Sequence, residues 1–83
     1  MKDILGREIV CYEEALYLKA AGFNCACTGY YHREDGYYGE DTYECVGWRG
    51  LFRNSYSQWR AAAPSKRAAK IWYTKNKVIQ FNP

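Results

Sequence analysis

The chain has 83 residues, of which 48% are hydrophobic and 25% charged, and its formal net charge is +3. This length fits one small domain, residues 1–83, with one thin core, and so mild a positive charge lies well below the footprint of a dedicated nucleic-acid-binding domain. No apolar run approaches the roughly 18 residues that a transmembrane helix needs. The start of the chain has no hydrophobic signal core. We therefore expect a cytoplasmic protein whose four cysteines are reduced thiols.

The first elements in chain order are a short extended segment and a helix. Residues 8–10 fit either a short strand or a leader into this helix. The helix is expected from Cys11 to Gly22, because the intervening residues favour a helix and glycine is a common C-terminal stop. Cys11 stands where a capping serine or threonine is usual, and Glu14 follows at the third position of a capping box. A thiol caps poorly, so we expect a weaker helix start than normal.

A hairpin should follow the first helix. Cys25 to Arg33 is rich in Cys, Thr and Tyr and predicts a strand. Asp35-Gly36 is a tight-turn signal, because these residues tolerate positive φ, and the return strand is expected to start at Tyr37-Tyr38. Glycines interrupt residues 39–62, for which we expect a short strand near 42–48 and then a loop or short helix.

The C-terminal third predicts an amphipathic helix and a last strand. The helix is expected from Lys66 to Lys75, with Ser65 as N-cap. Its inner face would carry Ala68, Ala69 and Trp72, flanked by Ile71 and Tyr73. Its outer face would carry Lys66, Arg67, Lys70 and Thr74. The last strand is expected at residues 78–81. The predicted fold class is α+β: a small antiparallel sheet of three or four strands with two helices on one face, in the core order α-β-β-α-β.

Residues 11–38 and 63–81 resemble a family of small proteins carried by phages and gut bacteria. That family has a helix ending in Lys-x-x-Gly-Phe, a Cys- and Tyr-rich strand pair, and a helix that begins at Ala-Pro-Ser/Thr. The matching residues are Ala15, Leu18, Lys19, Gly22, Phe23, Cys27, Tyr30, Tyr31, Gly36, Ala63, Pro64, Ser65, Ala68, Trp72, Lys75 and Ile79. The resemblance implies the fold and a phage or mobile-element origin, without a particular chemistry. The departures are Cys11 at the cap and an insertion at about 39–62.

The cysteines and the single histidine leave little room for catalysis. Cys25 and Cys27, joined by Cys11, Cys45 or His32, offer potential zinc ligands, but their spacing differs from the usual two-residue knuckle. We therefore favour small buried hydrophobic residues over zinc ligands. On a strand, Cys27 and His32 would face opposite sides, so a nucleophile–base pair is not expected. The sequence accordingly predicts a protein that is not an enzyme and that needs no cofactor.

Two charged clusters are expected to be solvated surfaces. The acidic residues near the hairpin match no calcium loop; they are Glu34, Asp35, Glu40, Asp41 and Glu44. The basic residues of the second helix could touch phosphates or acidic partners, but a solvated helix face is favoured; they are Lys66, Arg67, Lys70, Lys75 and Lys77.

The strongest candidate site alternates arginine with large aromatic residues. Its members are Trp48, Arg49, Phe52, Arg53, Trp59 and Arg60. Three interpretations stay open: a protein–protein hot spot, for which Trp, Tyr and Arg are preferred; a nucleotide or nucleic-acid site, since arginine and aromatic rings stack on bases; or core aromatic residues with outward arginine heads. We expect protein binding first, with a protein partner of host or phage and a homo-oligomer as candidates, and nucleotide sequestration as the alternative.

Overall fold

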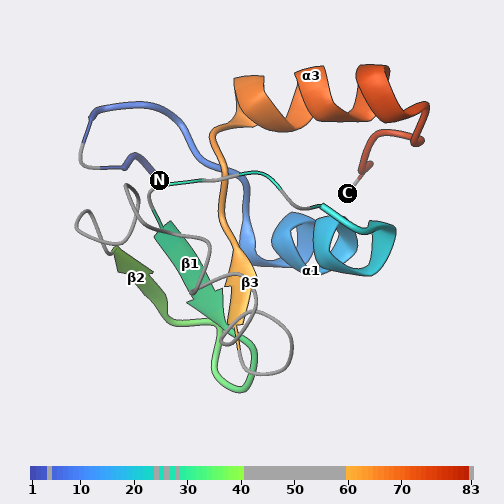
Figure 1. Cartoon of the computed structure of the whole chain (residues 1–83). Helices are drawn as coiled ribbons and strands as arrows, with labels where there is room; N and C mark the ends of the chain where they lie inside the picture. The colour runs from blue at the N-terminus through green and yellow to red at the C-terminus, as the bar shows by residue number, and fades with distance from the viewer. Residues whose placement is uncertain (4, 24, 26, 28, 41–59, 83) are drawn as a thin grey trace.

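The structure, a computed structural model, describes residues 1–3, 5–23, 25, 27, 29–40 and 60–82 (Figure 1). In this part of the chain the elements are α1 (Tyr12–Ala21), β1 (Gly29–His32), β2 (Tyr38–Glu40), β3 (Arg60–Ala62) and α3 (Lys66–Asn76). The strands form one antiparallel sheet in the order β2-β1-β3. The predicted α+β class is confirmed: two helices and a three-stranded antiparallel sheet make up the described structure.

The prediction of a last strand at residues 78–81 is wrong, and the third strand is β3 instead. The observed order is therefore α-β-β-β-α rather than α-β-β-α-β. After α3, Lys77 adopts a left-handed backbone (φ 56°) that turns the chain away from the helix axis. The tail then packs on α1, where the Tyr17 hydroxyl donates to the Ile79 carbonyl and the Tyr17 ring contacts Phe81. The tail is thus held against α1 by these contacts and does not pair with the sheet.

The hairpin turn is confirmed at Asp35-Gly36. Gly36 has a φ of 72°, a backbone that costs glycine little, and the Asp35 carboxylate accepts a 2.9 Å bond from the Tyr37 amide. The predicted strand is shortened, since Cys25 and Cys27 are not in a strand and β1 spans Gly29–His32. The strand expected near 42–48 and the loop or helix after it lie outside the described residues, up to residue 59.

The strand β3 joins the sheet although its sequence, Arg-Ala-Ala, has no strong strand signal. In register, Ala62 pairs with Tyr30 and Ala61 with Tyr31, and the Ala63 amide extends the pairing by donating to the Gly29 carbonyl at 3.0 Å. Ala61 and Ala63 are fully buried. Burial and pairing across a long sequence separation thus decide the strand, rather than local propensity.

Directly after β3, Pro64 and Ser65 pair with the N-terminal segment of the chain. The Val10 amide donates to the Pro64 carbonyl at 3.1 Å, and Ile9 forms an isolated antiparallel bridge with Ser65. Residues 8–10 therefore lead into α1 as extended chain held by bridges. One continuous stretch, residues 60–66, connects the sheet, the N-terminal segment and α3.

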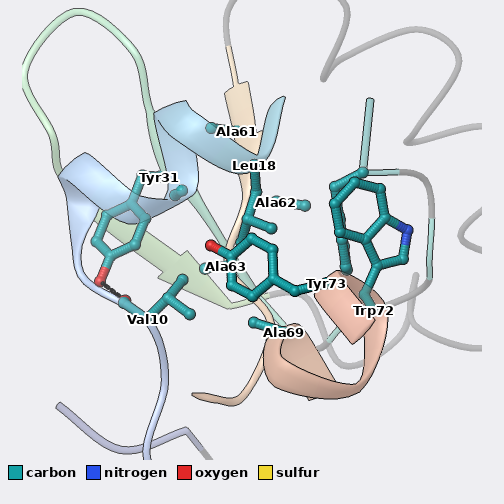
Figure 2. Packing of buried hydrophobic residues seen from close by; sticks show 11 residues of the cluster. Val10, Leu18, Tyr31, Ala61, Ala62, Ala63, Ala69, Trp72 and Tyr73 are labelled. Carbon is teal, nitrogen blue, oxygen red and sulfur yellow. Dashed lines mark hydrogen bonds between the residues drawn. The ribbon is translucent and has the colours of Figure 1, made fainter. Parts of the chain in front are cut away.

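The core lies between α1, α3 and the sheet face that carries Tyr31 (Figure 2). α1 lies against β3, and Phe23 meets Trp72 edge to face with ring centroids 5.4 Å apart. The buried face of α3 consists of Ala69, Trp72 and Tyr73. The expectation that Ala68 lies on this face is wrong, because Ala68 is exposed. The hydrophobic core cluster is Val10, Ala15, Leu18, Phe23, Tyr31, Ala61, Ala62, Ala63, Ala69, Trp72 and Tyr73.

Both predicted helix starts are confirmed. Ser65 accepts a 3.1 Å bond from the Ala68 amide, and the Cys11 thiol accepts a 3.4 Å bond from the Glu14 amide. Gly22 ends α1 with a left-handed backbone (φ 97°). At Cys11 the acceptor is a sulfur atom, for which weak capping is expected.

Replacing Tyr31 by phenylalanine should destabilise the fold by about 1–3 kcal/mol, because the buried carbonyl of Val10 loses its 2.7 Å donor. The matched control is Tyr12→Phe, whose hydroxyl donates at the surface to the Arg33 carbonyl; its loss should cost about 1 kcal/mol or less. Urea unfolding of both variants gives the comparison. Equal losses would contradict a structural role for the buried bond.

Cys11→Ser should raise stability by up to about 1 kcal/mol, because a hydroxyl accepts the N-terminal amide bond better than a thiol does. The reciprocal change Ser65→Cys at the start of α3 should lower stability by a similar amount. Thermal unfolding under reducing conditions measures both. A stabilising Ser65→Cys, or a destabilising Cys11→Ser, would sink this account of the caps.

Candidate binding surface

Of the six residues that the sequence nominates, Arg60 is described by the structure. Trp48, Arg49, Phe52, Arg53 and Trp59 lie outside the described residues. Arg60 begins β3 and is partly exposed. Its neighbours therefore show what surrounds one end of the predicted cluster.

The guanidinium of Arg60 lies over the ring of Tyr30, with its carbon 4.3 Å from the ring centroid. Arg60 pairs in register with His32, so Tyr30 is its diagonal neighbour on the same sheet face. Diagonal neighbours in a sheet lie within reach of long side chains, and a cation over an aromatic face is attracted by the ring quadrupole. The sheet register thus brings together two residues that are 30 positions apart in the sequence.

Two further rings continue the contact along the same side of β1. His32 meets Tyr30 edge to face at 5.3 Å and stacks on Tyr37 at 6.5 Å between centroids. Tyr37 is 71% exposed, whereas Tyr30 and His32 are half-buried. We call Arg60, Tyr30, His32 and Tyr37 the aromatic–arginine row.

Two glycines set the position of the neighbouring tyrosines. A Cβ atom at Gly39, which pairs with Tyr30, would lie 2.9 Å from the Tyr30 ring. On the other sheet face, a Cβ at Gly29 would lie 2.2 Å from the Tyr38 hydroxyl oxygen. Each tyrosine therefore lies across a glycine of the opposite strand, and a larger residue there would require the tyrosine ring to shift. The Tyr30 ring thus lies close to both Gly39 and the Arg60 guanidinium.

Tyr30, His32 and Tyr37 are not among the site residues that the sequence predicts. The strand pattern does indicate that Tyr30 and His32 lie on the same sheet face, because they are two positions apart. Nothing local indicated that Arg60 would pair with that strand. The missing information was the long-range register between β1 and β3.

Four tyrosine hydroxyls connect separate parts of the chain. Tyr31 donates to the Val10 carbonyl at 2.7 Å, as Figure 2 shows, and Tyr73 donates to the Glu14 carboxylate at 2.9 Å. Tyr12 and Tyr17 each donate at 2.5 Å, to the carbonyls of Arg33 and Ile79. Part of the tyrosine excess therefore holds the fold together.

Burial raises the pKa of three tyrosines. Loss of solvent is the main cause for Tyr31, Tyr38 and Tyr73, and the pKa of Tyr73 is raised further by its bond to the Glu14 carboxylate. The Tyr38 hydroxyl is buried and has no hydrogen-bond partner in the part of the chain that the structure describes. These hydroxyls favour the neutral form in the folded state.

The thiols and carboxylates of the described residues form no metal-binding cluster of three or more ligands. The Cys27 thiol donates to the Gly29 carbonyl at 3.1 Å, and Cys11 caps α1, while Cys25 is exposed. Cys45, another of the potential zinc ligands, lies outside the described residues. In the acidic cluster, Glu34, Asp35 and Glu40 are exposed, as expected for a solvated turn, and Asp41 and Glu44 lie outside the described residues.

Among the described residues, no helix is both long enough and apolar enough to cross a membrane. In comparisons with protein-family models, curated proteins and solved structures, the chain matches none of them. The resemblance to small phage and gut-bacterial proteins therefore stays a prediction.

The raised tyrosine pKa values predict unfolding at alkaline pH. The unfolded chain ionises its tyrosines near pH 10, whereas folding holds these three pKa values higher. The contribution of these tyrosines to the free energy of unfolding is therefore fully present below pH 10 and is lost as the pH rises above it. Urea titrations from pH 8 to about 11.5, with tyrosinate absorbance as a second signal, measure this. In Tyr73→Phe the fall should be shallower. Tyrosines that all ionise near pH 10 in an intact fold would contradict the assignment.

Proposed function

We propose that this chain is a non-catalytic binding protein that contacts a protein partner through an aromatic and arginine surface. The surface would combine the aromatic–arginine row with the residues nominated by the sequence, Trp48, Arg49, Phe52, Arg53 and Trp59. The observation that carries the proposal is the position of the Arg60 guanidinium over the Tyr30 ring.

This contact suits protein recognition for two reasons. The Tyr30 ring occupies one face of the guanidinium, so the N–H groups at its edge stay directed to a carboxylate or carbonyl of a partner. Because the ring already orders the long Arg60 side chain, less conformational entropy is lost when a partner binds. Tyr37, 71% exposed at the end of the row, adds apolar area with a polar tip. Arginine and tyrosine are the residue types enriched in binding hot spots.

The alternative is a protein that binds and sequesters a nucleotide or nucleic acid with the same cluster. The observation in its favour is that Tyr30, His32 and Tyr37 place three rings on one side of β1 beside a guanidinium. Such rings stack on bases without requiring one sequence. Binding to a nucleic-acid backbone would weaken steeply as salt rises, whereas an apolar protein interface would change little.

The family resemblance supports an accessory role in a phage or mobile element, in the cytoplasm. A small domain buries a limited core, so self-association is a physically reasonable way to gain stability. A homo-oligomer built on the aromatic–arginine row is one form that the proposed protein contact can take.

Native mass spectrometry of the full chain, followed by affinity purification with its partners, tests the proposal. We expect a multiple of the chain mass or a bound protein, and this assembly should weaken at least about tenfold in Arg60→Ala, since a hot-spot truncation costs roughly 2 kcal/mol or more. Arg60→Lys should restore only part of the assembly strength lost in Arg60→Ala, because a lysine ammonium keeps the positive charge but cannot stack its plane on the Tyr30 ring.

Lys75→Ala is the matched control, since it removes an exposed cation from α3 and leaves the row intact. Assembly that survives Arg60→Ala and the combined Trp48, Arg49, Arg53 and Trp59 alanine variant would overturn the proposal. A co-purified mass of nucleotide size, lost in Arg60→Ala, would favour the alternative.

A further inference from the structure

A second surface lies at the other end of β3, where the N-terminal segment meets the first turns of α3. It is a groove of about 450 Å³. Its lining residues are Arg7, Glu8, Ser65, Lys66, Arg67, Ala68 and Ile71. Arg60 begins β3 and α3 begins only at Lys66, so this groove is separate from the aromatic–arginine row.

Hydrogen bonds hold the two walls of the groove together. The Lys66 amide donates to the Glu8 carbonyl at 2.8 Å, which joins the start of α3 to the N-terminal segment. That segment is itself ordered by the buried Asp3, whose carboxylate accepts a 2.9 Å bond from the Arg7 amide and pairs with the Arg7 guanidinium at 2.8 Å. The groove is therefore a feature of the folded chain rather than of two loose segments.

The groove is strongly basic on the helix side. α3 carries four cationic side chains and no carboxylate. The charge of this one helix therefore exceeds the net charge of the whole chain, which is +3. Lys66 and Arg67 belong to this set, line the groove and are exposed. On the opposite wall, Glu8 pairs with the N-terminal amine at 3.1 Å, so its carboxylate is already matched by a cation. The local field thus favours an anionic ligand.

The helix side of the groove also has an apolar part. Ile71 is 59% exposed and lines the groove with Ala68, one turn earlier on α3. An exposed isoleucine beside lysine and arginine gives a ligand both an ionic and an apolar contact. Phosphate groups can use only the first of these, whereas an acidic peptide with an aliphatic side chain uses both.

We propose that this groove binds an acidic peptide segment of a partner protein, with one aliphatic side chain of that segment seated on Ala68 and Ile71 and its carboxylates paired with Lys66 and Arg67. Charge complementarity with Lys66 and Arg67 and the exposed side chain of Ile71 support this occupant. The proposal adds a second contact surface, and it stands or falls independently of the aromatic–arginine row.

Fluorescence anisotropy of the full chain with three labelled probes tests it, at a salt concentration of about 0.15 M, where only nearby charges act. The probes are a short peptide of glutamate and leucine, a matched peptide of glutamate and serine, and a DNA oligonucleotide of the same net charge. The glutamate–leucine peptide should bind about tenfold more tightly than the glutamate–serine peptide, as one buried aliphatic side chain allows.

The variants separate the groove from general electrostatic attraction. Ile71→Ser should remove the preference for leucine, while Lys66→Glu and Arg67→Glu should each weaken peptide binding at least about tenfold, because like charges then face each other. A glutamate in the first turn suits the helix dipole, so these changes should leave α3 folded. Lys77→Glu makes the same charge change beyond the helix end and outside the groove; it should alter binding by no more than about twofold.

Equal binding of the two peptides, or equal losses in Lys66→Glu and Lys77→Glu, would overturn the proposal. Tighter binding of the DNA oligonucleotide than of the glutamate–leucine peptide would overturn it too and would identify a phosphate-binding surface. Arg60→Ala should leave peptide binding unchanged, so failure of the groove and failure of the proposed function can be told apart.

Discussion

The structure depends on the pairing of residues 60–66 with chain segments that are distant in sequence. At its start this stretch pairs with β1, through Ala62 and Tyr30 among others. At its end it pairs with the N-terminal segment, through Pro64 and Val10. Ala63, which lies between these two regions, is fully buried. Small side chains here let α1 lie close to β3, which closes the core over the sheet.

This central stretch also determines where both proposed surfaces lie. Arg60 at its beginning meets the Tyr30 ring because β3 is in register with β1. Lys66 at its far end begins α3 and forms one wall of the groove. One extended segment therefore connects the two surfaces.

The many tyrosines have two roles that composition alone cannot separate. Tyr31 and Tyr73 are buried, and their hydroxyls join elements that are far apart in the chain. Tyr37 is mostly exposed and has its ring in the row beside His32. An excess of aromatic residues in a small domain is thus in part a means of closing a thin core with directional bonds, and in part a supply of contact area.

The sequence predicted those features that depend on neighbouring residues. The helix caps at Cys11 and Ser65 and the turn at Asp35-Gly36 follow from hydrogen bonds and backbone preferences that act within three or four positions. The alanines of β3 carry no such signal, because their place in the sheet comes from burial and from pairing with residues about 30 positions away.

At the C-terminal tail, by contrast, a local strand signal is present but no strand forms. Its Val-Ile-Gln-Phe run has strong strand propensity, yet Tyr17 binds it to α1. The candidate site shows the same limit: the alternation of arginine with aromatic residues indicates Arg60, but its partner Tyr30 follows only from the sheet register.

Hydrogen exchange of individual amides, followed by NMR on the full chain, tests the central pairing most directly. The Ala63 amide donates to the Gly29 carbonyl and the Lys66 amide to the Glu8 carbonyl, while the Val10 amide donates to the Pro64 carbonyl within this stretch. They should exchange only on global unfolding, with protection equal to that of the amides inside α1, because no local opening exposes a doubly paired segment. Exchange of these three amides as fast as that of the chain termini, while α1 stays protected, would contradict the account.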